Sequence, residues 1–193
     1  MSVAGMHSAT EMGESSWVSE VLRFWFDELG EAHWFAKSAA VDAQIHDRFL
    51  ALHQQIAAQD GVAVAGPRAL LATVIVLDQF SRNLFRGTPR AYATDPIARR
   101  LSRIAIEQGL DLGMQQRERM FLYLPFEHSE DREDQELSVK LIERLGNEDW
   151  IRYAMAHKAI IDRFGRFPHR NAVLNRQSSA DEIALLKDPM GSF

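Results

Sequence analysis

The sequence contains no cysteine. Its absence excludes disulfide bonds, zinc–thiolate sites, iron–sulfur clusters and cysteine nucleophiles together. No uncharged apolar run approaches the roughly 20 residues needed to cross a bilayer. The first fifteen residues also lack the basic region and apolar stretch of a secretory signal. We therefore expect a soluble, cytoplasmic protein that does not associate with a membrane.

The sequence also lacks the basic character of a nucleic-acid-binding domain. Its formal net charge is −5 and its pI is about 5.8, which argues against nucleic acid as a partner. With 193 residues, 46% of them hydrophobic, the chain can form one well-buried core. Residues 1–13 are small, polar and without periodicity, so we expect a disordered leader there. Residues 14–193 are predicted to form a single domain.

No segment shows the period-two alternation of a half-buried strand, whereas every long segment has helical spacing. One clear apolar stripe recurs at steps of three and four residues: Val41, Ile45, Phe49, Leu52 and Ile56. Glycine and proline divide the chain into about eight helices with short connections, which predicts antiparallel neighbours. The predicted fold is all-α. No self-similar repeat with a period near 34 residues is present.

The most informative stretch runs from Ala69 to Arg90. Residues 69–77 are uncharged and predict a core helix, which we expect the second, fourth and seventh helices of the chain to flank. Five polar residues follow: Asp78, Gln79, Arg82, Asn83 and Arg86. At about 100° per residue they fall within roughly 140° of one face, where Leu71 and Ile75 lay before. A buried stripe that becomes polar predicts a pocket. The alternative is an ordinary intrahelical ion pair between Asp78 and Arg82, worth a few tenths of a kcal/mol.

Two further segments place polar groups beside apolar helices. Pro125, expected to end the fifth helix, precedes a cluster formed by Glu127, His128, Ser129 and Glu130. His157 lies within the buried stripe of the seventh helix. The loop that follows contributes four candidates: Arg166, His169, Arg170 and Asn171. Each segment also has a structural interpretation, as helix caps, a hydrogen-bonded core histidine, or arginines bound to helix carbonyls.

Because an unpaired buried charge costs several kcal/mol, we expect these three segments to converge and neutralise one another. Three acids are available for this: Asp78, Glu127 and Glu130. The arginines are more numerous: Arg82, Arg86, Arg163, Arg166 and Arg170. An excess of arginine predicts a pocket suited to a carboxylate or phosphate.

Two functional hypotheses follow. The favoured one is a binding module for a small anionic molecule or a peptide carboxylate, with a ligand-binding set of Asp78, Gln79, Arg82, Asn83, Arg86, Arg166, His169, Arg170 and Asn171. The alternative is a small hydrolase or transferase whose catalytic groups are His128, His157 and Glu130, one histidine being the general base. A helical scaffold with purely structural polar clusters is the third possibility. Metal-ligand motifs and glycine-rich phosphate loops are absent, so we predict neither metal nor cofactor. Nothing in the sequence indicates an oligomeric state.

Four runs of residues carry a family resemblance: Val21 to Phe26, Leu77 to Pro96, Tyr123 to Ser138 and His157 to Leu174. In these runs the chain resembles the bacterial family called domain of unknown function 924, which has a tetratricopeptide-repeat-like fold. It departs from the usual sequence pattern of the family at Ser81, where proline is common, and near Asn175, where glycine is common. The resemblance implies stacked antiparallel helix pairs. It implies no activity, catalytic residue or cofactor.

Overall fold

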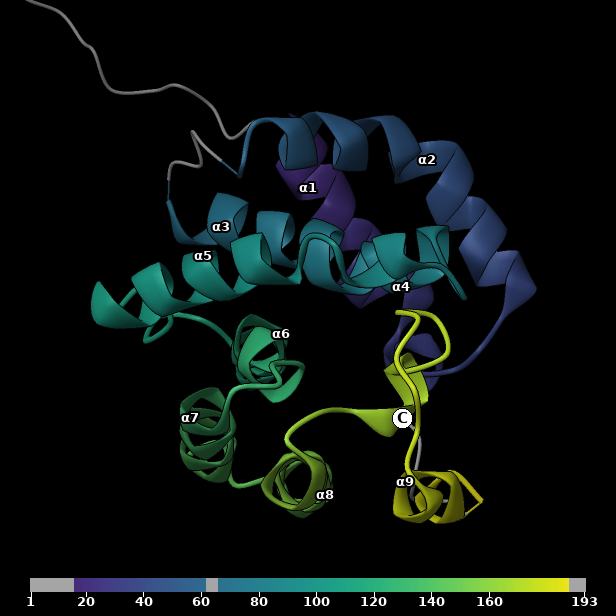
Figure 1. Ribbon diagram of the computed structural model, residues 1–193. Coiled ribbons are helices and arrows are strands. Elements are labelled where there is room, and N and C mark those ends of the chain that lie inside the picture. Colours follow the sequence, from purple (N-terminus) through teal and green to yellow (C-terminus); the bar gives the residue numbers. More distant parts are fainter. Residues whose placement is uncertain (1–15, 62–65, 188–193) are drawn as a thin grey trace, which may run out of the picture.

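The computed structural model describes residues 16–61 and 66–187, which are helical and contain no strand (Figure 1). The predicted leader, residues 1–13, lies outside this part of the chain. The helical elements are α1 (Ser16–Arg23), η1 (Phe24–Leu29), η2 (Glu31–His33), α2 (Ala39–Ala58), α3 (Pro67–Val74), η3 (Ile75–Phe80), α4 (Ser81–Leu84), η4 (Pro89–Tyr92), α5 (Asp95–Glu107), α6 (Gln116–Glu127), α7 (Arg132–Glu143), α8 (Glu148–Phe164), η5 (Pro168–Arg170) and α9 (Ala180–Leu185). The predicted all-α fold is confirmed. Among the described helices, none is both long and apolar enough to cross a bilayer.

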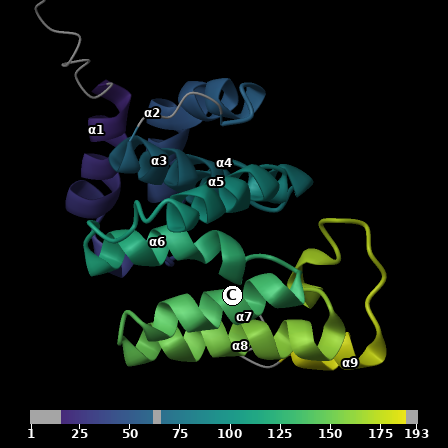
Figure 2. The same ribbon diagram turned by 90° about the vertical axis from the view of Figure 1, so that its left-hand side faces the viewer.

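Helices α6, α7 and α8 show the predicted antiparallel stacking. They pack in sequence order, α6 on α7 and α7 on α8, and lie side by side in both views (Figures 1 and 2). Short connections with side-chain caps enforce this arrangement. Asp131 begins α7 by accepting a hydrogen bond from the backbone N–H of Glu133 at 2.8 Å, and Asn147 caps α8 through the N–H of Trp150. Each cap satisfies a backbone donor that the first helical turn leaves free.

The predicted central helix is continuous through α3, η3 and α4, although its middle is wider than an α-helix. Residues 75–80 form a π-helical segment, η3, of the kind that often occurs at functional sites. Every residue from Leu70 to Ser81 is buried. The helix packs against α1, α2, α5 and α6. The expectation that α8 would flank it was wrong, because α6 covers that side and α8 packs on α7 instead.

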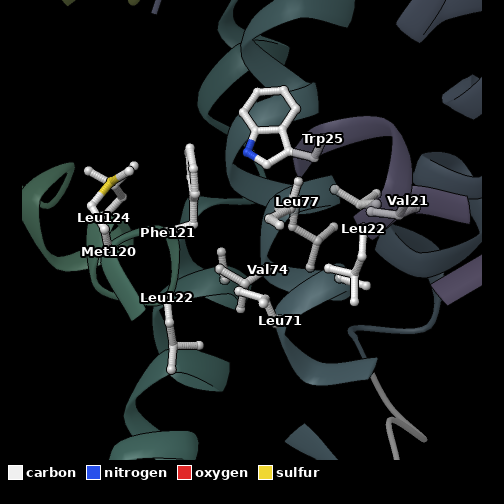
Figure 3. Packing of buried hydrophobic residues seen from close by; sticks show 14 of the residues in the cluster. Val21, Leu22, Trp25, Leu71, Val74, Leu77, Met120, Phe121, Leu122 and Leu124 are labelled. Atoms are coloured by element: carbon white, nitrogen blue, oxygen red, sulfur yellow. The ribbon is translucent and has the colours of Figure 1, made fainter. Parts of the chain in front are cut away.

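An apolar core fixes the first half of this helix. Leu71, Val74 and Leu77 lie between Trp25 of η1 and the side chains of α6 (Figure 3). The rings of Trp25 and Phe121 meet edge to face, with centroids 5.3 Å apart and planes at 79°. This geometry is favourable for aromatic pairs and adds to the stabilisation from burial.

Pro125 does not end its helix, contrary to the sequence expectation. Helix α6 continues through it to Glu127, and the backbone N–H of His128 donates to the carbonyl of Leu124 at 2.9 Å to close the last turn. Phe126 and Glu127 are buried, so tertiary packing outweighs the local cost of a proline so near the helix end. As a result, α6 carries Glu127 and His128 to the polar part of η3.

Candidate functional site

Asp78 is the centre of a polar cluster that also contains Gln79, Arg82, Asp95, His128 and Arg170. Its carboxylate is fully buried and accepts a hydrogen bond from Nδ1 of His128 at 2.8 Å and one from Nε2 of Gln79 at 2.5 Å. Nη2 of Arg82 lies 3.8 Å away. Burial alone raises the pKa of Asp78, but the charge and hydrogen bond of His128, together with Arg82 and Gln79, outweigh it and lower the pKa. Asp78 is therefore a carboxylate, and Nδ1 of His128 must be the donor.

The other ring nitrogen of His128 is uncommitted. Nδ1 is bound to Asp78, whereas Nε2 has no hydrogen-bond partner among residues 16–61 and 66–187. The side chain is 18% exposed, so solvent reaches the ring. A buried carboxylate that fixes Nδ1–H leaves the lone pair of a neutral imidazole on Nε2. The ring is thus oriented as a proton acceptor at the edge of the cluster.

Arg82 neutralises a residue that the sequence interpretation missed. Its guanidinium forms a bidentate pair with Asp95, at 2.8 and 2.9 Å, and also donates to the carbonyl of Ala91. Burial lowers the pKa of Arg82, but Asp95 and Asp78 raise it more. Burial, helped by Asp78, raises the pKa of Asp95 against the opposing effect of Arg82. The sequence, with Pro96 next to it, predicts Asp95 as the N-cap of a helix, but α5 begins at Asp95 and its N-cap is Thr94, which makes no side-chain capping bond.

Arg170 joins the third segment to the first two. Its Nη2 donates to the carbonyl oxygen of His128 at 2.9 Å, and its Nη1 lies 3.9 Å from Asp95. The guanidinium stacks on the rings of Tyr92 and Phe167, at 4.7 and 4.5 Å from their centroids. Burial, followed by the charge of Arg82, lowers its pKa. The three polar segments therefore meet, as the convergence argument predicts.

The loop that contains Arg170 holds several buried polar atoms without a hydrogen-bond partner in the described chain: Nδ1 of His169, Nε of Arg170, Oδ1 of Asn171 and Nε of Arg176. Buried polar atoms in folded proteins are nearly always paired, so such a concentration is unusual. Burial, then the charge of Arg170, lowers the pKa of His169 to about 4, so this ring is neutral at pH 7. The loop therefore concentrates polar atoms whose hydrogen bonds the described residues do not complete.

Glu127 and His157 lie behind His128 and form a neutral pair. Nδ1 of His157 is 3.1 Å from Oε1 of Glu127 and 2.9 Å from the carbonyl oxygen of Tyr153. Burial, with Asp78 adding to it, raises the pKa of Glu127 to about 8, and burial lowers the pKa of His157 to about 3. At pH 7 the carboxyl is mainly protonated and the imidazole is uncharged. The two residues therefore carry a proton without adding net charge.

The structure places the remaining candidates outside the cluster. Asn83 and Arg86 both bind Asp42 of α2, and Arg166 binds Glu182 of α9. Glu130 accepts two hydrogen bonds from Arg176 and one from the backbone N–H of Phe167. The excess of arginine inferred from sequence is thus absent, because the count omitted Asp42, Asp95 and Glu182. Within the cluster, Arg82 and Arg170 balance Asp78 and Asp95.

A sequence profile of bacterial proteins of unknown function, the DUF924 family, matches residues 21–190. The chain belongs to this family. The chain is also similar to a solved structure, that of a protein of unknown function from Agrobacterium tumefaciens. The two are 40% identical and superpose with a TM-score of 0.83, and the match covers 88% of this chain and 96% of the other. A search of curated proteins gave no match. The family and fold implied by the resemblance are confirmed, and neither comparison names a reaction or a ligand.

The side chains of the described residues form no group of three or more histidine, aspartate or glutamate residues able to hold a metal ion. Asp78 and His128 are committed to each other, and Asp95 is committed to Arg82. The chemistry that this arrangement offers is therefore proton transfer at Nε2 of His128 and anion recognition at Arg170.

Proposed function

We propose that this protein is an acid–base enzyme, a hydrolase or transferase, in which His128 is the general base and Asp78 its orienting carboxylate. The observation that carries the proposal is the 2.8 Å hydrogen bond from Nδ1 of His128 to the fully buried Asp78, with Nε2 uncommitted among described residues. A carboxylate in this position fixes the tautomer and stabilises the imidazolium that forms when Nε2 takes a proton.

In the reaction, Nε2 of His128 removes a proton from the attacking water or hydroxyl group. The resulting oxygen nucleophile adds to the electrophilic centre of the substrate, and the imidazolium returns its proton to the leaving group. Gln79 and Arg82 hold the Asp78 carboxylate in place. Arg170 contacts both the backbone of His128 and the edge of Asp95, so we assign it the binding of an anionic substrate group.

The perturbed pKa values support this proposal. Within one cluster, burial raises the pKa of Glu127 to about 8 and lowers those of His157 and His169 to about 3 and 4. Groups with strongly shifted pKa values that gather around a partly exposed base are characteristic of catalytic sites. An interior built for stability alone is better served by apolar side chains, because replacing a buried ion pair with them is often neutral or stabilising.

A second candidate, anion binding without turnover, is favoured by the loop of residues 169–176. Its buried, unpartnered polar atoms, including Nε of Arg170, fit a site that is completed by a ligand. Under this candidate His128 is a hydrogen-bond donor or acceptor to the ligand and releases no product.

The test is an activity screen with panels of carboxylic esters, phosphate esters and amides, each with and without an anionic group. We expect turnover of at least one anionic member, and His128→Gln should reduce kcat by about 100-fold or more, because glutamine cannot cycle a proton. His46→Gln is the matched control: His46 also lies beside an aspartate, Asp47, at 3.3 Å, but on the exposed surface of α2.

Three results would decide between the two candidates. Loss of turnover in His128→Gln, with His46→Gln unaffected, supports the enzyme. Saturable binding of an anionic panel member without turnover, removed by Arg170→Gln, supports the binding candidate. Equal turnover in wild type and His128→Gln contradicts a general base at this position.

A further inference from the structure

A second feature lies on another face of the central helix, against α2. A surface cavity of about 260 Å³ is bordered by His53 and Gln54 of α2, by Phe85, and by Arg90 and Thr94 of the segment that follows. At about 30 Å³ for each water, it has room for roughly nine waters or a ligand of similar size. Its lining shares no residue with the pair Asp78 and His128.

His53 is buried at the wall of this cavity, with only 4% of its surface exposed. Its Nε2 lies 2.7 Å from Oγ of Ser81, which is 2.8 Å from Oγ1 of Thr94. The Thr94 hydroxyl in turn donates to the carbonyl of Leu77 at 2.6 Å. The Ser81 hydroxyl itself donates to the carbonyl of Leu77 at 2.7 Å. Because this uses its one proton, the Ser81 oxygen must accept from His53, and we assign the ring proton to Nε2.

This assignment leaves Nδ1 of His53 as a lone-pair acceptor. Nδ1 is buried and has no hydrogen-bond partner among the described residues. Burial, followed by the charge of Arg90, lowers the pKa of the ring to about 4, so it is uncharged at neutral pH. A buried acceptor without a partner is costly unless a ligand or water supplies a donor.

Arg90 supplies the charge of the cavity. Its guanidinium stacks on the ring of Phe85, 3.9 Å from the centroid, and it forms no ion pair or side-chain hydrogen bond with residues 16–61 or 66–187. Arg82 of α4 and Arg86 of the turn that follows it are by contrast held by Asp95 and Asp42. The ring of Phe85 is also 5.1 Å from that of His53. The guanidinium of Arg90 and the ring of His53 therefore both lie against the ring of Phe85.

We propose that this cavity binds a small 2-hydroxycarboxylate. Arg90 binds the carboxylate, Nδ1 of His53 accepts the hydrogen bond of the neighbouring hydroxyl, and a short aliphatic remainder packs on Phe85 and on Ala57 and Ala93 of the lining. A guanidinium recognises a carboxylate through parallel N–H donors. The bare nitrogen discriminates in favour of ligands with a donor, because the analogue without one leaves that nitrogen unpaired.

The test compares two acids that differ in one hydroxyl: 2-hydroxy-3-methylbutanoate and 3-methylbutanoate. Binding to the full chain is measured by NMR titration through the millimolar range, with the ¹⁵N resonances of His53 as the local probe. We expect the hydroxy acid to bind about tenfold more tightly or better, and only the hydroxy acid to shift Nδ1 toward its hydrogen-bonded position.

Variants locate the site. Arg90→Gln, an exposed substitution, should weaken both acids by about tenfold or more, whereas Arg152→Gln on α8 should leave both unchanged. His53→Gln should make the two affinities equal; should that variant not fold, the Nδ1 resonance of the wild type gives the same information. Equal affinities in the wild type, no effect of Arg90→Gln, or no saturable binding of either acid would overturn the proposal. The outcome is independent of turnover at His128.

Discussion

The central helix contains two halves that are equally buried and chemically opposite. From Leu70 to Leu77 every side chain except Thr73 is apolar and belongs to the main hydrophobic core. From Asp78 to Ser81 the same helix carries a carboxylate, an amide and a hydroxyl, and the partly exposed guanidinium of Arg82 follows. The change occurs within the π-helical segment η3, without a change in burial. Burial alone therefore does not distinguish the structural part of this helix from the part with chemistry.

The two halves differ in how their burial is stabilised. In the first half, removing apolar surface from water is favourable for each residue separately. In the second half, each charge is tolerated only because a partner from another segment meets it: His128 at Asp78 and Asp95 at Arg82. Interactions of this kind contribute little net stability and make each member dependent on the other. The polar half is therefore the sensitive one, to pH as well as to substitution.

The largest expected difference concerns pH. The pKa of Glu127 is raised to about 8 from an ordinary value of 4.5, so the folded state holds a proton that the unfolded state releases. Stability present below about pH 4.5 is lost progressively as the pH rises through 8. Glu127→Gln removes this dependence, and between pH 5 and 8 the free energies of unfolding of wild type and variant should diverge by about 3.5 kcal/mol. Urea unfolding at both pH values measures it. Parallel pH profiles would contradict the neutral buried carboxyl.

An effect of similar size is expected from Arg82→Leu. The substitution leaves the largely buried Asp95 without its bidentate partner and removes a positive charge from Asp78, so we expect a loss of about 3–5 kcal/mol. Arg86→Leu, in the turn after α4, is the control, because Arg86 also forms a bidentate pair, with Asp42, but its side chain is 41% exposed. It should cost about 1 kcal/mol or less. Equal losses in the two variants would show that burial of the pair does not matter.

The smallest effect belongs to the apolar half. Ile75→Val removes one methylene from a fully buried side chain and should cost about 0.5–1.5 kcal/mol at every pH. Chemical denaturation at the same two pH values measures it. If the cost of Ile75→Val changed with pH, the apolar half would be coupled to the titrating groups, and the contrast between the two halves would be wrong.

The fold was largely predictable from sequence because its signals are local. Apolar spacing identified the helices, and Ser38, Asn147 and Ser179 cap helices as side chains of these types do. Pro125 was misjudged because tertiary packing, which no local signal reports, keeps α6 helical through it. The placement of α8 failed for a similar reason, since the sequence does not say which helix covers a given face.

The site was predictable only in part. The change of polarity along one helix face identified Asp78 and Arg82, and the cost of buried charge led to His128 and Arg170. The pairing partners Asp95, Asp42 and Glu182 were missed, because an acid near the start of a helix has an adequate local explanation as a cap or a dipole partner. His53 and Arg90 gave no signal, since an isolated histidine in an amphipathic helix and an exposed arginine are ordinary. Both residues lie against the ring of Phe85, and only the folded structure brings them there.

The central claim is that the polar half keeps one nitrogen, Nε2 of His128, available as a proton acceptor. Histidine ¹⁵N NMR tests it directly, at a pH where the His128 ring is neutral. We expect a protonated Nδ1 hydrogen-bonded to Asp78 and an unprotonated Nε2, with the Nδ1 signal displaced in Asp78→Asn. A neutral ring that carries its proton on Nε2 instead would rule out His128 as the general base, because no base would then face the surface.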